Sequence, residues 1–363
     1  MQPAPITCFA RLIVPSLLAA ALPAWAQTEP PLPTLQECAA IGAAADRLAC
    51  YDRLAGRALP TPAPGDTPAS TTQLAPAFAP AAAANGSEPD ASLLSKYWEL
   101  DARDKRGTFN LLGYRANYIA PLHATNRINR APSSPTQVVV NQPNYRRVEA
   151  KFQISLRTKV LQDVFDTGGD VWLAFTQQAM WQIWNGRDSK PFRNTDYEPE
   201  ASFVLPTKPG LRRLPWGWQW RFTQLAIAHQ SNGQSDPLSR SWNRIYAGVG
   251  IERGDLTLIG RVSQRIGERY SSDNNPDLVD YRGRGEVQLG WTPGASTTSV
   301  LYRTAVQGPK YGALQLEWTY PMKRAQPNGL RWFVQAFSGY GETLTDYNFR
   351  QSSFALGLMF MQF

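Results

Sequence analysis

A histidine and a serine separated by one residue are the side chains of this sequence best suited to chemistry. His229 and Ser231 follow the apolar residues Leu225 and Ile227, and a stretch rich in Asn, Gly, Asp and Pro comes next. An imidazole that takes the hydroxyl proton makes the serine oxygen a nucleophile. The pair therefore indicates nucleophilic catalysis, although a His-x-Ser sequence alone also suits an ordinary exposed loop.

Asn243 is the candidate for a third group. Residues 225–246 have the pattern strand, loop, strand. Side chains two positions apart on a strand share a face, so His229 lies beside Ser231, and Asn243 shares a face with Ile245. If the strands pair as a hairpin, the three polar groups gather at the top of one apolar face. The amide would then hold the imidazole in the tautomer that activates the serine.

Composition limits the alternatives. The chain has 363 residues, a net charge of +8 and a pI of about 9.4, but only 2 His and 3 Cys. These counts exclude a Cys-rich zinc site and make a His/Cys metal centre a poor expectation. His123 follows Pro121 and Leu122, and we expect it to be structural. The basic residues are dispersed along an exported chain, which excludes a nucleic-acid partner.

The first 92 residues divide into three parts. Residues 1–26 have the features of a signal peptide: a basic flank at Arg11, an apolar stretch and an Ala-Trp-Ala cleavage site. Export leads to an oxidising compartment, so Cys38 and Cys50 in the small segment 27–58 are expected to form a disulfide, with two buried free thiols as the alternative. Residues 59–92 are rich in Ala and Pro and predict a flexible linker.

Residues 93–363 read as a succession of β-strands. Apolar and polar residues alternate with period two, and Gly, Pro, Asn and Asp separate the runs. Such strands suit a soluble sandwich or a membrane barrel. Three features favour an all-β, antiparallel, outer-membrane-type barrel: polar alternate faces, Trp and Tyr near strand ends, and an apolar last strand that ends at Phe363. Polar groups on the lipid face cost a few kcal/mol each unless they bond one another, as a Ser–His–Asn relay would.

From about Tyr97 to Phe363 the sequence resembles the bacterial outer membrane phospholipase A family. The block HxSNGxSDPxSRSWNR from His229 to Arg244 is similar to the active-site motif of that family. Four other stretches also resemble it: 151–156, 189–199, 273–277 and 338–349.

The resemblance implies a twelve-stranded transmembrane barrel in the bacterial outer membrane, with its active site outside, near the outer-leaflet headgroups. It implies a calcium-dependent phospholipase A1/A2 and lysophospholipase that is a monomer at rest and a homodimer when active. Membrane phospholipids would be the substrates. Ser231 would be the nucleophile, His229 the base and Asn243 its orienting partner.

The resemblance also implies calcium ligands. These are the backbone carbonyl of Gln234, where the family has Arg, the side chain of Ser239, and Ser189 from the partner subunit. Asn274 aligns with an acidic residue of a second calcium position, where an amide oxygen is a weaker ligand. Gln177 matches a polar residue of the dimer interface.

Two non-enzymatic alternatives remain at this point. The polar alternate faces also suit a channel, and the Cys-containing segment suits a surface scaffold that binds a partner. Acidic residues elsewhere, such as Asp101, Asp104 and those around Asp273, are expected to be solvated loop charges.

Overall fold

A computed structural model describes residues 34–55, 92–267, 273–304 and 311–361. The predicted signal peptide, residues 1–26, and the linker, residues 59–92 except Ser92, lie outside the described residues. Contacts divide the chain into two compact units, residues 1–73 and 74–363.

The first unit is a pair of short helices joined by a disulfide. Helix α1 (Leu35–Ala39) and helix α2 (Ala44–Leu54) carry Cys38 and Cys50, whose sulfurs are bonded and whose Cα atoms lie 5.4 Å apart. The predicted disulfide is therefore present. Both cysteines are buried, and a unit this small depends on such a cross-link because its apolar core is slight.

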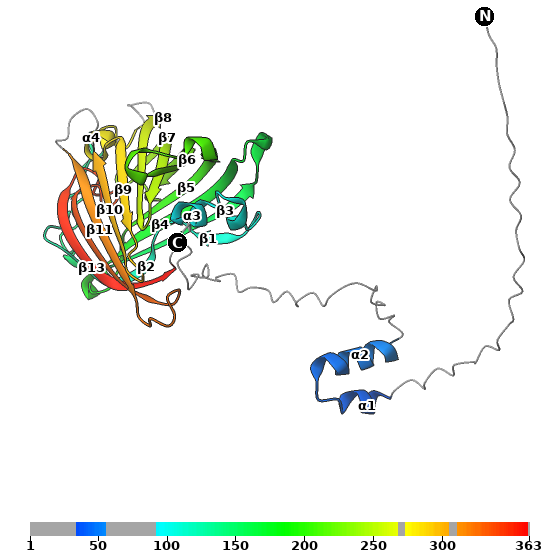
Figure 1. Cartoon of the computed structure of the whole chain (residues 1–363). Coiled ribbons are helices and arrows are strands. Elements are labelled where there is room, and N and C mark those ends of the chain that lie inside the picture. Colours follow the sequence, from blue (N-terminus) through cyan, green and yellow to red (C-terminus); the bar gives the residue numbers. More distant parts are fainter. Residues whose placement is uncertain (1–33, 56–91, 268–272, 305–310, 362–363) are drawn as a thin grey trace, which may run out of the picture. The chain divides into compact units, whose positions relative to one another are not determined.

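The second unit is a closed, antiparallel, twelve-stranded β-barrel, as expected (Figure 1). Each strand from β2 to β13 pairs with the next along the chain, and β13 pairs with β2 to close the ring. The short β1 pairs with β3 next to the segment of β3 that pairs with β2, so β1 and β2 occupy one strand position of the barrel. The strands are β1 (Leu111–Gly113), β2 (Asn117–Thr125), β3 (Val148–Leu161), β4 (Asp170–Trp181), β5 (Phe192–Pro206), β6 (Gln219–Ser231), β7 (Ser241–Arg253), β8 (Leu256–Ile266), β9 (Gly285–Trp291), β10 (Thr297–Thr304), β11 (Gly312–Pro321), β12 (Arg331–Tyr340) and β13 (Arg350–Met361).

The alternation in the sequence sorts side chains between the two sides of the wall. On β6, Leu225 and Ile227 are 57% and 51% exposed on the outside, whereas Gln224 and Ala228 are buried inside. An apolar outer surface of this kind suits contact with hydrocarbon. Among the described helices, none has both the length and the apolar character that a membrane span requires.

Ion pairs and hydrogen bonds fill the lumen. Arg193 pairs with Glu149 at 2.8 Å, and Lys151 pairs with Glu342 at 2.9 Å. Cavities of about 50 and 90 Å³ remain between such groups. Spaces of this size hold a few water molecules and differ from the aqueous channel of a porin. The filled lumen therefore argues against the channel alternative.

A short helical segment closes one end of the lumen. Helix α3 (Leu93–Trp98) places Trp98, which is 1% exposed, against Trp172 and Phe222, at ring-centroid distances of 5.6 and 5.9 Å. Just after the helix, Glu99 pairs with Lys159 at 2.8 Å. The segment is thus held by both an aromatic cluster and a buried ion pair.

The expectation of solvated loop charges is wrong for three acidic residues. Asp101 bonds Arg212 at 2.9 Å, and Asp104 accepts a hydrogen bond from a serine of α3. Asp273, only 7% exposed, pairs with Arg265 at 2.8 Å. Arg212 lies 111 positions from Asp101, whereas the partners of Asp104 and Asp273 lie only nine and eight positions away.

We predict that Trp98→Ala destabilises the barrel by about 3–5 kcal/mol, because it removes a fully buried indole and leaves a cavity. Guanidinium unfolding in lipid vesicles, followed by tryptophan fluorescence, measures the change. Trp216→Ala is the matched control, since this indole is 84% exposed on a turn. Equal unfolding midpoints for the two variants would show that the α3 segment does not hold the barrel.

Candidate active site

Strand register brings His229 and Asn243 together. They are direct partners on β6 and β7, and His229 Nδ1 lies 2.8 Å from Asn243 Oδ1. Because an amide oxygen can only accept, Nδ1 carries a proton, and in the neutral imidazole Nε2 is then the nitrogen with the free lone pair. The expected contact is present, and it leaves the outer nitrogen able to act as a base.

Ser231 is the last residue of β6 and the next position on the same outward face. Its Oγ accepts a hydrogen bond from the Gly233 N–H at 3.2 Å. In the described part of the chain, Oγ makes no hydrogen bond to His229. Proton transfer to the imidazole therefore requires the serine side chain to turn away from the loop. Catalytic hydrogen bonds commonly tighten only when substrate binds.

Gly233 is needed where the chain leaves the strand beside Ser231. Its φ is +62°, and a Cβ atom at this position would lie 3.0 Å from a ring carbon of Tyr197. Tyr197 stands opposite Ser231 on β5. The glycine therefore allows both the turn and the close approach of the aromatic ring to the backbone at Gly233.

The polar trio sits at the top of an apolar outer surface. His229 is exposed, and below it on the same face lie Leu225, Ile227 and Ile245, all more than two-fifths exposed. The trio is at the barrel end opposite the start of β2 and the end of β13, where the described connections include residues 126–147 and 273–284. Outer-membrane barrels place their longer loops at the extracellular end, so the site faces lipid near that interface.

The predicted ligands Gln234 and Ser239 lie in one loop, residues 232–240, between β6 and β7. The Arg240 guanidinium donates to the carbonyls of Pro237 and Ser239, at 2.9 and 2.7 Å, which occupies both oxygens. Burial lowers the pKa of this guanidinium, against the opposing charges of Tyr347, Asp277 and Asp236.

The side-chain amide oxygen of Gln234 in this loop lacks a hydrogen-bond partner among the described residues. This atom, Oε1, is buried. The described part of the chain also contains no cluster of three or more His, Cys, Asp or Glu side chains suited to a metal. The oxygens of this loop are mostly neutral, with Asp236 as its one carboxylate, and a hard ion such as Ca²⁺ accepts ligands of both kinds.

The other predicted ligands are placed less directly. Asn274 contacts the loop, because its Nδ2 donates to Asp236 at 3.1 Å, but its Oδ1 already accepts from Gln137 at 2.7 Å. Ser189 is exposed in the separate loop between β4 and β5, directly after a 3-10 turn (Gly186–Asp188).

Gln177 lies on the outer surface at the level of the site. It is the register partner of Tyr197, which in turn is the partner of Ser231. A polar residue at this level is partly buried between exposed apolar neighbours such as Phe175. The position is compatible with an interface residue.

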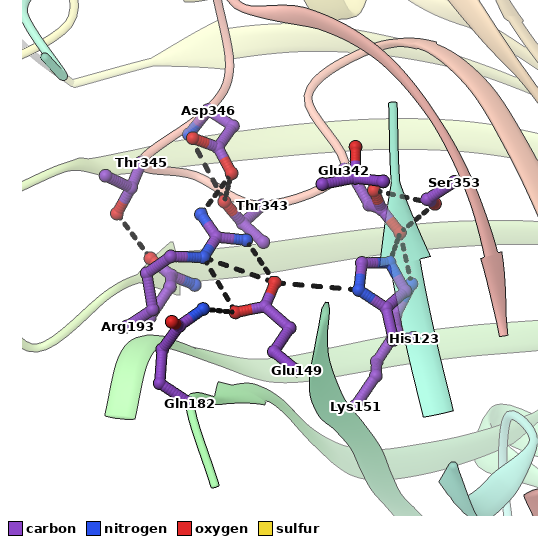
Figure 2. Close-up of polar contacts among 12 residues, drawn as sticks. His123, Glu149, Lys151, Gln182, Arg193, Glu342, Thr343, Thr345, Asp346 and Ser353 are labelled. Carbon is purple, nitrogen blue, oxygen red and sulfur yellow. Dashed lines mark hydrogen bonds and ion pairs between the residues drawn. The ribbon is translucent and has the colours of Figure 1, made fainter. Parts of the chain in front are cut away.

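His123 lies inside the barrel, away from the trio. Its Nε2 is 3.0 Å from Glu342 and its Nδ1 is 3.5 Å from Glu149, and the ring is fully buried (Figure 2). The structural role expected for it agrees with this position.

Sequence reasoning missed the polar residues beneath the site. Asn232, in the 232–240 loop, is buried on the lumen side, as are Arg193 and Thr345, which contact this loop. All three fall in stretches that resemble the family, 189–199, 229–244 and 338–349, but alternation and composition do not distinguish them from other inward polar or loop residues.

Comparison with known proteins identifies relatives. The phospholipase A1 family matches residues 94–360. A Neisseria meningitidis protein that carries a provisional phospholipase A1 name is 38% identical over 90% of this chain and 91% of its own length. Phospholipase A1 of Escherichia coli K12 is 31% identical over 69% of this chain and 81% of its own.

Solved structures agree with these relatives. Outer membrane phospholipase A from Escherichia coli superposes with a TM-score of 0.62 and 31% identity, over 70% of this chain and 100% of that chain. A calcium-bound dimer of the Salmonella typhi outer membrane phospholipase matches with a TM-score of 0.61 and 30% identity, over 70% and 94% of the two chains. The chain therefore belongs to the outer membrane phospholipase A family, whose members are named phospholipase A1.

Proposed function

We propose that this protein hydrolyses the acyl esters of phospholipids at the outer surface of its barrel, in the bacterial outer membrane. The observation that carries the proposal is the bonded pair His229–Asn243 beside Ser231, on a surface exposed to lipid. A substrate with its ester at the interface and its acyl chains in hydrocarbon reaches such a site without leaving the membrane. Esters at both glycerol positions and in lysophospholipids are the expected substrates.

Ser231 is the nucleophile in this mechanism. Its Oγ bonds the ester carbonyl carbon while His229 Nε2 takes the hydroxyl proton. The tetrahedral intermediate then breaks the ester bond, and the imidazolium returns the proton to the departing alcohol. A water molecule, deprotonated by the same imidazole, releases the fatty acid and restores the serine.

Asn243 keeps the imidazole in the productive tautomer, since its carbonyl oxygen accepts from Nδ1–H. A neutral amide orients the ring without adding charge. Next to hydrocarbon, where a desolvated carboxylate is costly, this is the cheaper orienting group.

Gln234 and Ser239 would hold a calcium ion, together with Ser189 of the partner subunit. Calcium bound there would supply positive charge next to the ester carbonyl, where negative charge develops in the transition state. The assigned ligand atoms are the backbone carbonyl of Gln234 and the side chain of Ser239, and their position in one loop supports this assignment, as does the exposure of Ser189. A weaker second position at Asn274 would require the Gln137 contact to open.

Activity would depend on pairing of two subunits, because one ligand comes from the partner. Gln177 and the surrounding apolar side chains at the level of Ser231 would form the interface. The monomer would be the resting form. Disturbance of the bilayer would then both admit phospholipid to the outer leaflet and allow monomers to pair.

Ser231→Ala is expected to reduce ester hydrolysis in calcium-containing micelles by at least about a thousandfold, because the nucleophile is lost. His229→Ala should lose a similar factor, and Asn243→Ala less. Ser338→Ala is the control, since this serine is exposed on the outer surface of β12. Unchanged heat-modifiable mobility shows that the variants fold, and a folded, fully active Ser231→Ala enzyme would disprove the assigned nucleophile.

Removal of calcium with a chelator is expected to abolish hydrolysis, and added calcium should restore it. Magnesium should not, since it is smaller, demands a regular octahedron and gives up its water reluctantly. The rate of fatty acid release at fixed ionic strength measures the effect. A rate unaffected by the chelator would remove the metal from the mechanism.

A mixture of two inactive variants tests the shared site. In a heterodimer of Ser231→Ala and Ser189→Ala subunits, one site combines an intact Ser231 with an intact Ser189 from its partner. Random pairing should restore about a quarter of wild-type activity, because half of the dimers are mixed and each has one complete site. If mixing restores nothing while each variant crosslinks as a dimer, Ser189 does not act across the interface.

A further inference from the structure

One buried side chain ties together the loop that follows Ser231. Asn232 is 2% exposed and faces the lumen. Its Oδ1 accepts from the Arg240 N–H at 2.9 Å and from the Gln234 N–H at 3.3 Å, while its Nδ2 donates to the Leu238 carbonyl at 2.8 Å. Three of the four bonds that an amide can make thus fix both ends of the 232–240 loop.

The fourth bond leaves the loop. Asn232 Nδ2 donates to Thr345 Oγ1 at 3.2 Å, and Thr345 belongs to the loop between β12 and β13, residues 341–349. The Thr345 hydroxyl donates in turn to Asn194 Oδ1, so its proton points away and its lone pair faces Asn232. Thr345 is 4% exposed, and water competes little for this contact.

The 341–349 loop is itself fixed inside the barrel. Arg193 lies between Asp346, at 2.6 Å, and Glu149, at 2.8 Å, and all three are buried (Figure 2). The Leu344 N–H donates to Asp196 at 2.9 Å. The partner that Thr345 offers to Asn232 therefore belongs to a rigid base.

The buried network around Arg193 makes a second contact with the 232–240 loop. Gln234 Nε2 donates to the Arg193 carbonyl at 3.4 Å. The two contacts hold the first half of the loop, where the proposed ligand Gln234 lies, against the barrel interior. The proposed ligand Ser239 precedes Arg240, whose N–H is also held by Asn232.

We infer that Asn232 and Thr345 are positioning residues that hold the 232–240 loop in its calcium-binding conformation. The inference rests on the proposed function. A loop with few protein ligands binds a cation only when its oxygens already converge, and apparent affinity falls by the fraction of molecules in which they do not. Among the described residues, Thr345 bonds Asn232 and Asn194 and has no hydrogen bond to the serine or to the proposed metal ligands, so its effect passes through Asn232.

Thr345→Val tests the inference, because it keeps the shape of the side chain and removes the hydroxyl. We expect the calcium concentration for half-maximal hydrolysis to rise about two- to tenfold, as for one lost hydrogen bond. The rate at saturating calcium should stay within about twofold of wild type. Thr345→Ser, which restores the hydroxyl, should restore the wild-type calcium requirement.

A second measurement does not depend on activity. Calcium should raise the thermal unfolding temperature of the wild-type protein, and Thr345→Val should need proportionally more calcium for the same rise. Ser353→Ala is the matched control, since it removes a buried hydroxyl that donates to Glu342 elsewhere in the lumen. It should lower the unfolding temperature without changing the calcium requirement. If Thr345→Val does not assemble, Thr345→Ala removes the same hydroxyl without adding a methyl group.

The outcomes separate this inference from the proposed function. An unchanged calcium requirement in a folded Thr345→Val protein would overturn the positioning role. An equal shift in Ser353→Ala would also overturn it, because any loss of lumen stability would then be sufficient. A wild-type protein that responds to calcium neither in activity nor in unfolding would refute the metal assignment itself, before any variant is compared.

Discussion

Backbone polar groups inside hydrocarbon must be paired with one another, and this requirement determines the closed barrel fold and the two faces of its strands. A sheet in lipid cannot leave an open edge, so its strands must close into a ring. Closure then gives every strand one side toward lipid and one toward an enclosed lumen. The outer side must be apolar, which makes the exposed pair His229–Asn243 unusual and confines it to the end of β6, where the wall meets the interface.

Closure also sets the chemistry of the interior. Lumen side chains are mostly cut off from bulk water, so their charges must find partners within the barrel. Arg193 and Glu149 show the result, since both are fully buried and bonded to each other. A network satisfied in this way is stiff, and it gives the loops above it a fixed base. A surface that must accept mobile lipid thus rests on an interior that moves little.

Period-two alternation in the sequence was enough to predict the strands, their two faces and the meeting of His229 with Asn243. These depend on neighbours in one hairpin. The number of strands was implied only by the family resemblance, because an alternating pattern does not determine how many strands close a barrel. Partners across the lumen, such as Asp346 for Arg193 and Thr345 for Asn232, depend on closure and could not be predicted. The ion pair of Asp101 with the distant Arg212 was also missed.

The seam of the ring joins the first full strand of the barrel to the last. β2 pairs with β13, and more than two hundred residues separate Thr125 from its partner Ser353. Neither strand can be satisfied in hydrocarbon until the other arrives, so a partly assembled wall has two unpaired edges and no stable place in the bilayer. A chain shortened by its final strand would leave that gap permanently. Insertion of this protein should therefore be an all-or-none event that waits for the last residues to be delivered.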